Sequence, residues 1–193
     1  MSASLVDRQE VVNFGCRLNI AEGEAIRSAI KVAGARNTIV FNSCAVTDEA
    51  VRQARQAVRR ALRERPGAEV IVTGCAAELE ADRFAEMGAR VVRNDAKGLA
   101  QSYGGEMAEP GVRPYAPALS GADHARAFLG VQTGCSHSCT FCATVLARGT
   151  ARSADVDAVV TSARTALDRG QREVILTGVD LASYGDDLSL IHI

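Results

Sequence analysis

The sequence of 193 residues contains no tryptophan, and aromatic residues make up only 4% of it. Its core must therefore rely on small aliphatic side chains, a composition that favours α/β packing. No charge of one sign prevails, because 22 basic residues face 23 acidic ones, so the chain as a whole does not attract nucleic acid or membranes. No apolar run is long enough to span a bilayer, and no secretory signal is recognisable.

Six cysteines stand in this sequence without a secretory signal, which predicts a reducing cytoplasm. In that compartment closely spaced cysteines indicate metal or redox sites rather than disulfides. Two groups can be distinguished. Cys16, Cys44 and Cys75 are spread at intervals of about 30 residues, and Cys135, Cys139 and Cys142 form a compact C-x3-C-x2-C run.

A repeating strand–helix pattern runs through the first hundred residues. Strands are predicted at 11–14, 38–41, 70–72 and 90–92, and helices at 20–33, 48–65 and 78–86, with caps at Asn19 and at Thr47 or Asp48. The period matches a βαβ unit and predicts a parallel sheet with helices on both faces. Cys16, Cys44 and Cys75 each follow a strand, and they are expected to converge on the carboxyl edge of the sheet, where such folds bind ligands.

Residues 103–124 hold three of the four prolines and are predicted to link a first domain at 1–102 to a second at 125–193. The second domain contains strands at 127–131 and 173–176 and a helix capped by Ser153 that runs to about 168. Together these elements make one more βαβ unit. The compact cysteine run follows its first strand, at the end that is the catalytic face in a (β/α) barrel.

The compact run suits a four-iron, four-sulfur cluster with one iron left unligated. Such clusters usually take four cysteines, and three thiolates leave one iron free for another ligand. In radical chemistry that ligand is S-adenosylmethionine (SAM). Two alternatives stay open: a zinc site with His137 as the fourth ligand, and cysteines that simply pack in the core.

Several segments carry a family resemblance. They are residues 13–19, 42–47, 73–75, 134–142, 148–149, 152–153, 176–180 and 183–185. In these segments the chain resembles the methylthiotransferases of the radical SAM superfamily, most closely the branch that modifies threonylcarbamoyladenosine in tRNA. The resemblance implies an N-terminal methylthiotransferase domain followed by the start of a radical SAM (β/α) barrel.

The resemblance also implies two [4Fe–4S] clusters as cofactors. One would sit on Cys16, Cys44 and Cys75 with an iron open for a sulfur species, and the other on Cys135, Cys139 and Cys142 with an iron open for SAM. Two further residues are candidates for cofactor binding. Phe141 is placed to pack beside the cluster or the SAM adenine, with core packing as the alternative, and Gly178 is placed for close backbone approach to SAM, with a plain turn as the alternative.

The implied reaction is methylthiolation of C2 of N6-threonylcarbamoyladenosine at tRNA position 37, in the cytoplasm and without a membrane. A radical generated from SAM removes the hydrogen, sulfur comes from the N-terminal cluster, and a second SAM supplies the methyl group. A reductant protein and a sulfur donor are expected partners beside tRNA. Alternative substrates are another tRNA adenosine or a ribosomal protein aspartate. No side chain is assigned as a catalytic acid or base, since His124 and His137 are expected at the surface.

Three features set limits on this interpretation. Residues 143–146 replace the proline-containing segment that usually follows the third cysteine in the family. The chain also stops after the second strand of the second domain, and 189–193 match no family segment, so we expect an N-terminal fragment that is inactive alone. Finally, Arg52, Arg55 and Arg59 share one face of a helix, which indicates either RNA contact or a solvated surface.

Overall fold

The computed structural model describes residues 8–104 and 115–188, and the chain divides into two compact units. The first comprises Met1–Gly15 and Ala25–Glu109, and the second comprises Cys16–Glu24 and Pro110–Ile193. The linker prolines Pro110 and Pro114, and the tail at 189–193, lie outside the described residues. In the described part of the chain, no helix combines the length and apolar character that crossing a membrane requires.

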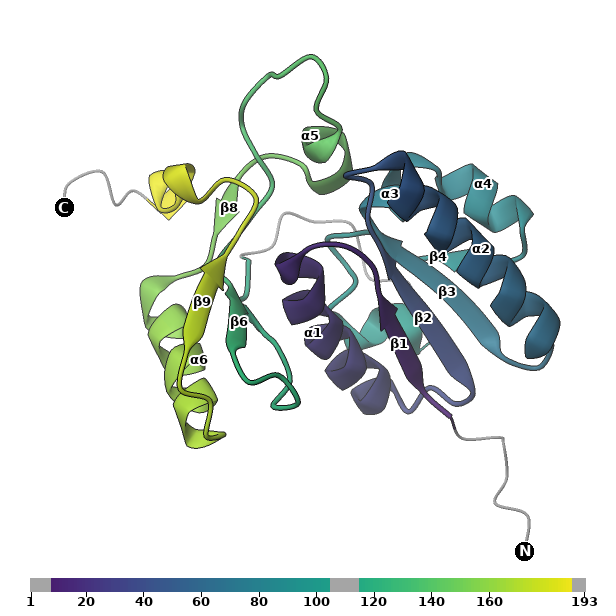
Figure 1. Cartoon of the computed structure of the whole chain (residues 1–193), viewed down its shortest axis with the longest axis horizontal. Helices are drawn as coiled ribbons and strands as arrows, with labels where there is room; N and C mark the ends of the chain where they lie inside the picture. Colours follow the sequence, from purple (N-terminus) through teal and green to yellow (C-terminus); the bar gives the residue numbers. More distant parts are fainter. Residues whose placement is uncertain (1–7, 105–114, 189–193) are drawn as a thin grey trace, which may run out of the picture. The chain divides into compact units, whose positions relative to one another are not determined.

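Four parallel strands form the sheet of the first unit, in the order β1-β2-β3-β4 (Figure 1). They are β1 (Glu10–Asn13), β2 (Thr38–Ser43), β3 (Glu69–Gly74) and β4 (Arg90–Val91). Asn13 pairs with Asn42, and Asn42 pairs with Thr73, so the first three strands end level with one another. The predicted α/β fold with a parallel sheet is confirmed.

Helices cover both faces of this sheet, because successive side chains of a buried strand point to opposite sides. The helices are α1 (Arg17–Ala33), α2 (Asp48–Glu64), α3 (Cys75–Leu79) and α4 (Ala81–Glu86). Ile30 of α1 shares a core with Val40 of β2, whereas Val58 of α2 and Phe84 of α4 share the opposite core with Phe41. β2 is buried along its whole length, as a strand between two helical layers must be.

α2 begins as the sequence predicts, because the Ala50 N–H donates to Thr47 Oγ1 at 3.2 Å. Its arginine face is largely paired with acids of the same unit. Arg52 lies 2.7 Å from Glu49, and Arg55 lies 3.6 Å from Glu80. These ion pairs favour the solvated-surface interpretation of the face over RNA contact.

Three predicted helix boundaries are wrong. Asn19 does not cap α1 but lies inside it and is fully buried, because its side chain is used in a tertiary contact described below. Ser153 does not cap the helix that follows it, α6 (Val156–Asp168), because its hydroxyl accepts a hydrogen bond from the Gly185 N–H. Asp155 caps that helix instead, accepting from the N–H groups of its first turn. The helix predicted at 78–86 is divided, because the backbone at Glu80 is not helical.

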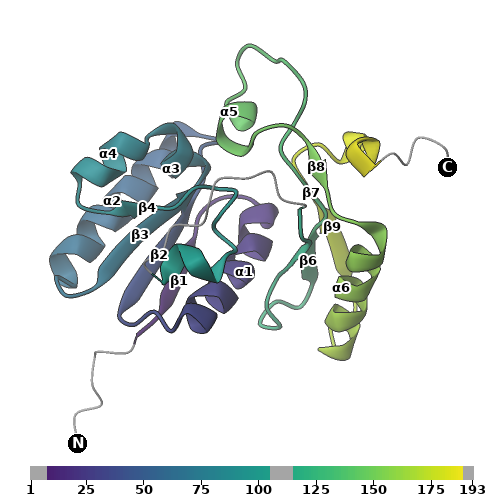
Figure 2. The ribbon, with the colours of Figure 1, turned by 180° about the vertical axis from the view of Figure 1, so that it is seen from behind.

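The second unit is built around a parallel strand pair, β6 (Ala127–Gly130) and β9 (Val174–Thr177), joined through α6 (Val156–Asp168). Figure 2 shows α6 running alongside this pair. β5 (Ala118–Leu119) adds to β6 antiparallel, within the segment expected to be a linker. β7 (Gln132–Thr133) pairs with β8 (Arg152–Ser153), and α5 (Thr144–Arg148) lies between them in sequence. The predicted βαβ arrangement of this unit is thus present.

Candidate functional site

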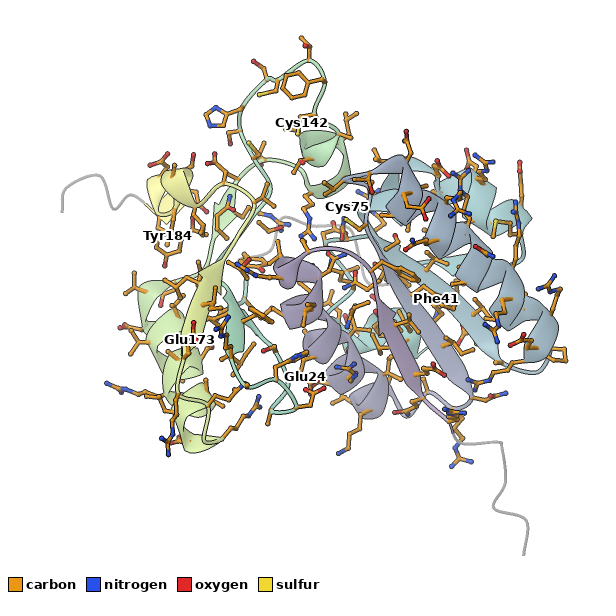
Figure 3. The ribbon with its side chains drawn as sticks, in the orientation of Figure 1. Glu24, Phe41, Cys75, Cys142, Glu173 and Tyr184 are labelled. Carbon is orange, nitrogen blue, oxygen red and sulfur yellow. The ribbon has the colours of Figure 1, made fainter. Side chains whose placement is uncertain are left out.

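Two cysteines of the first group occupy matching positions at the carboxyl edge of the first unit's sheet. Cys44 directly follows β2. Cys75, which is labelled in Figure 3, directly follows β3. Ser43 and Gly74, the residues that precede them, are paired in register. Cys44 is buried and Cys75 is partly exposed, and both are free thiols. Cys16 follows β1 by three positions and is exposed, and it belongs to the second unit.

A glycine with positive φ precedes three of the six cysteines. The φ angles are +88° at Gly15, +92° at Gly74 and +72° at Gly134. At Gly15 any side chain is excluded for a second reason, since a Cβ there would collide with the Cβ and Sγ of Cys44. The chain therefore turns sharply just before Cys16, Cys75 and Cys135, where only glycine takes this conformation without strain.

Polar groups that the sequence interpretation did not single out lie beside Cys75. Asn94 Nδ2 is 4.0 Å from Cys75 Sγ, and Lys97 Nζ donates to Asn94 Oδ1 at 2.8 Å. Lys97 is buried, so its ammonium is an uncommon positive charge near the sheet edge. The sequence could have indicated Asn94 and Lys97 as residues at the sheet edge, because both follow the strand predicted at 90–92.

The compact cysteine run lies in the loop between β7 and α5, where Figure 3 labels Cys142. The Cys142 N–H donates to the Cys139 carbonyl at 3.2 Å, which closes a turn. All three cysteines are free, and Cys139 and Cys142 are exposed. Cys142 Sγ lies 3.2 Å from Thr144 Oγ1, and hydrogen bonding to Thr144 lowers the pKa of the Cys142 thiol. Phe141 is 92% exposed, so it does not pack in the core.

A second set of potential ligands overlaps the cysteine loop. The ligand atoms of Cys135, His137 and Asp180 all lie within 4.8 Å of one another. His137 Nε2 is 3.1 Å from Asp180 Oδ2, and Cys135 Sγ is 3.8 Å from the same oxygen. The Ser183 hydroxyl donates to that oxygen at 2.7 Å and is the main reason that the pKa of Asp180 is lowered. Such short separations suit one metal ion, whereas in a cluster each thiolate binds a different iron.

Gln132 connects this loop to the end of β9. Its side chain is fully buried. Oε1 accepts hydrogen bonds from the N–H groups of Val179 and Asp180 at 2.9 Å each, and Nε2 donates to the Gly134 carbonyl at 2.8 Å. Gly178 lies directly against it, since a Cβ there would be 3.0 Å from Gln132 Oε1. Gln132 therefore sets the position of 178–180 relative to Cys135. The sequence offers only one sign of this role, a polar residue directly after the apolar strand predicted at 127–131.

Replacing Gly134 with alanine is expected to destabilise the chain more than replacing Gly149 does. Gly134 has φ +72°, and Gly149 has φ +73° with ψ −164°, so alanine is strained at both positions, by roughly 1–3 kcal/mol. At Gly134 the new Cβ would collide with the Thr150 carbonyl, whereas at Gly149 it would meet no atom of the described residues within 4 Å apart from its chain neighbours. The clash adds roughly 1–3 kcal/mol. Urea unfolding followed by circular dichroism measures both variants, and equal losses would show that the close approach at Gly134 is unimportant.

Comparison with known proteins identifies the relatives of this chain. The family model described as "Uncharacterized protein family UPF0004" matches residues 8–93. The threonylcarbamoyladenosine tRNA methylthiotransferase MtaB of Rickettsia prowazekii is 39% identical to the chain over 191 residues, which covers 94% of the chain and 45% of that protein. Nearly the whole chain is thus similar to the N-terminal part of a methylthiotransferase.

Other methylthiotransferases match over the same extent. MtaB of Bacillus subtilis is 35% identical, covering 91% of the chain and 44% of that protein. The ribosomal protein uS12 methylthiotransferase RimO of Salmonella paratyphi B is 26% identical, covering 92% of the chain and 43% of that protein. The chain thus spans less than half the length of the methylthiotransferases that it matches.

Proposed function

We propose that this chain carries the cofactor-binding part of a radical SAM tRNA methylthiotransferase that acts at C2 of N6-threonylcarbamoyladenosine at position 37. The main support is the placement of free cysteines at the carboxyl ends of strands in both units, with Cys44 and Cys75 in matching positions. The substrate assignment follows the greater identity to proteins named for threonylcarbamoyladenosine, 39% against 26% for the protein named for a ribosomal substrate.

The donor groups suit two [4Fe–4S] clusters. Thiolates are the usual protein ligands of such clusters. Cys135, Cys139 and Cys142 are free and stand on one turn-containing loop, and the lowered pKa of Cys142 favours its thiolate form. Cys16, Cys44 and Cys75 would hold the second cluster. When bound, the clusters would supply the electron for SAM cleavage and the sulfur for transfer.

The chain's own groups would position these cofactors. Gln132 holds the backbone at Val179 and Asp180 next to the cysteine loop. Gly178 has no side chain, so its backbone can lie directly against Gln132. Phe141 presents an exposed ring beside Cys142 that can stack on an adenine. tRNA would be the macromolecular partner, with a reductant protein and a sulfur donor in a reducing cytoplasm.

A zinc site is the second candidate, and one observation favours it. Cys135, His137 and Asp180 place a sulfur, a nitrogen and an oxygen within 4.8 Å, a donor set that zinc accepts. Purified chain that is brown and absorbs at roughly 400 nm carries iron–sulfur clusters. Colourless chain with bound zinc would replace the cluster proposal with a non-catalytic zinc-binding module.

The substrate is tested by mass spectrometry of tRNA nucleosides from a strain that lacks the full-length gene to which this chain belongs. The 2-methylthio form of threonylcarbamoyladenosine should disappear and return when the gene is restored. A gene copy carrying Cys142→Ala should fail to restore the methylthio nucleoside, because one cluster ligand is missing. In that strain threonylcarbamoyladenosine without the methylthio group should remain in the tRNA. Persistence of the methylthio nucleoside in the deletion strain, together with a loss of methylthiolation on ribosomal protein, would assign the other substrate class.

A further inference from the structure

Arg148 carries a buried guanidinium group in the second unit, with only 4% of its side chain exposed. Nη1 donates to Glu22 Oε1 at 2.8 Å and to Thr133 Oγ1 at 3.0 Å. Nη2 donates to Glu22 Oε2 at 3.0 Å and to Asn19 Oδ1 at 2.8 Å. The guanidinium therefore binds the carboxylate with both nitrogens and satisfies two further acceptors with the same planar group.

Glu22 interrupts the apolar side of α1. Leu18 and Ile26, four residues before and after it, are almost completely buried, and the Glu22 carboxylate is buried between them along the helix. Burying a charge pair is rarely the most stable choice, since apolar residues of similar volume often do at least as well. Glu22 is a charged residue on the apolar face of α1, and such departures from the expected pattern are typical of functional sites.

The four residues of this network flank the proposed cluster ligands in sequence. Thr133 lies two positions before Cys135, and Arg148 lies six positions after Cys142. Asn19 and Glu22 lie three and six positions after Cys16. One guanidinium thus joins both ends of the cysteine loop to the helical turn that follows Cys16. The base of the loop is closed as well, because the Cys135 N–H donates to the Gly149 carbonyl at 3.1 Å.

We propose that Arg148 is a positioning residue that, through Glu22 and Asn19, sets the separation between Cys16 and the loop carrying Cys135, Cys139 and Cys142. The reason for setting this separation rests on the proposed function. Sulfur delivery and hydrogen removal must reach the same substrate atom, and errors of about an ångström in such geometry greatly reduce rates. A lysine could not substitute, because it lacks the planar fork that serves three partners at once.

The test measures the separation directly, without iron. Nitroxide labels are attached to Cys16 and Cys139, which are both exposed, in a chain whose other four cysteines are alanine. Pulsed electron paramagnetic resonance then gives the distribution of distances between the labels. We expect one narrow distribution in this parent. Arg148→Lys and the double substitution Glu22→Met with Arg148→Met should broaden or shift it.

Two comparisons make the result decisive. Arg126→Met removes an exposed ion pair of the same unit, with Glu173 at 2.7 Å, and should leave the distribution unchanged. The double variant leaves no unpaired buried charge and should keep the parent's circular dichroism spectrum. An unchanged distribution in that folded double variant would overturn the proposal, and so would its unfolding, which would make the network an element of stability alone. Failure of the proposed function would appear separately, as the absence of bound iron in the chain with all six cysteines.

Discussion

Alanine at Cys135, Cys139 and Cys142 together is expected to remove about half of the iron bound after anaerobic reconstitution, because each cluster contains about four irons. It should also abolish the change that SAM produces in the electron paramagnetic resonance spectrum of the reduced chain. The reason is that the loop proposed to hold the iron left open for SAM would lose all its ligands, and its thiols are free and mostly exposed. Iron and sulfide analysis measures the first effect, and the spectrum with and without SAM measures the second.

The matched variant carries alanine at Cys16, Cys44 and Cys75. It should lose the other half of the iron while keeping the spectral response to SAM, since the compact loop is intact. Cys44 is small and buried, and alanine there should leave the circular dichroism spectrum unchanged. A response to SAM that survives in the first variant, or unchanged iron in the second, would contradict the assignment of two separate sites.

Replacing Arg148 alone with methionine is expected to lower the free energy of unfolding by roughly 3–5 kcal/mol. The substitution leaves the Glu22 carboxylate buried without its main partner, and breaking a buried ion pair on one side has a cost of this size. Substituting methionine for both Glu22 and Arg148 should recover most of the loss, to within about 1 kcal/mol of the parent, because both charges of the pair are removed together. Urea unfolding followed by circular dichroism compares the variants.

An exposed pair of the same type provides the control. Arg126 and Glu173 are 2.7 Å apart, with 60% and 53% of their side chains exposed, so Arg126→Met should change stability by less than about 1 kcal/mol. If Arg148→Met were equally mild, water would have to reach Glu22 in the folded chain, and the network would not be the rigid contact that its distances indicate. If the double variant were as unstable as the single one, packing rather than charge would explain the loss.

The amino-acid sequence by itself determined the strand–helix repeat of the first unit and the strand ends at which Cys44 and Cys75 lie. Both depend on local patterns: apolar runs, caps such as Thr47, and glycines that end elements. Parallel pairing then aligns strand ends without further information, because each crossover returns the chain to the same edge. Element boundaries were less predictable. Asn19 and Ser153 have the composition of caps, but tertiary partners use their side chains instead.

Only the tertiary structure decided which polar side chains meet. Arg148 reaches Glu22 and Asn19 across 126 and 129 residues of sequence, and Gln132 reaches the backbone 47 and 48 residues ahead. No spacing encodes such pairs, because hydrogen-bond partners at this separation depend on how whole segments pack and which groups that packing removes from water. The same packing places Cys16–Glu24 in the second unit, although the sequence pattern assigned this stretch to the first. The cysteines could therefore be found from their order along the chain, whereas the residues that set their geometry could not.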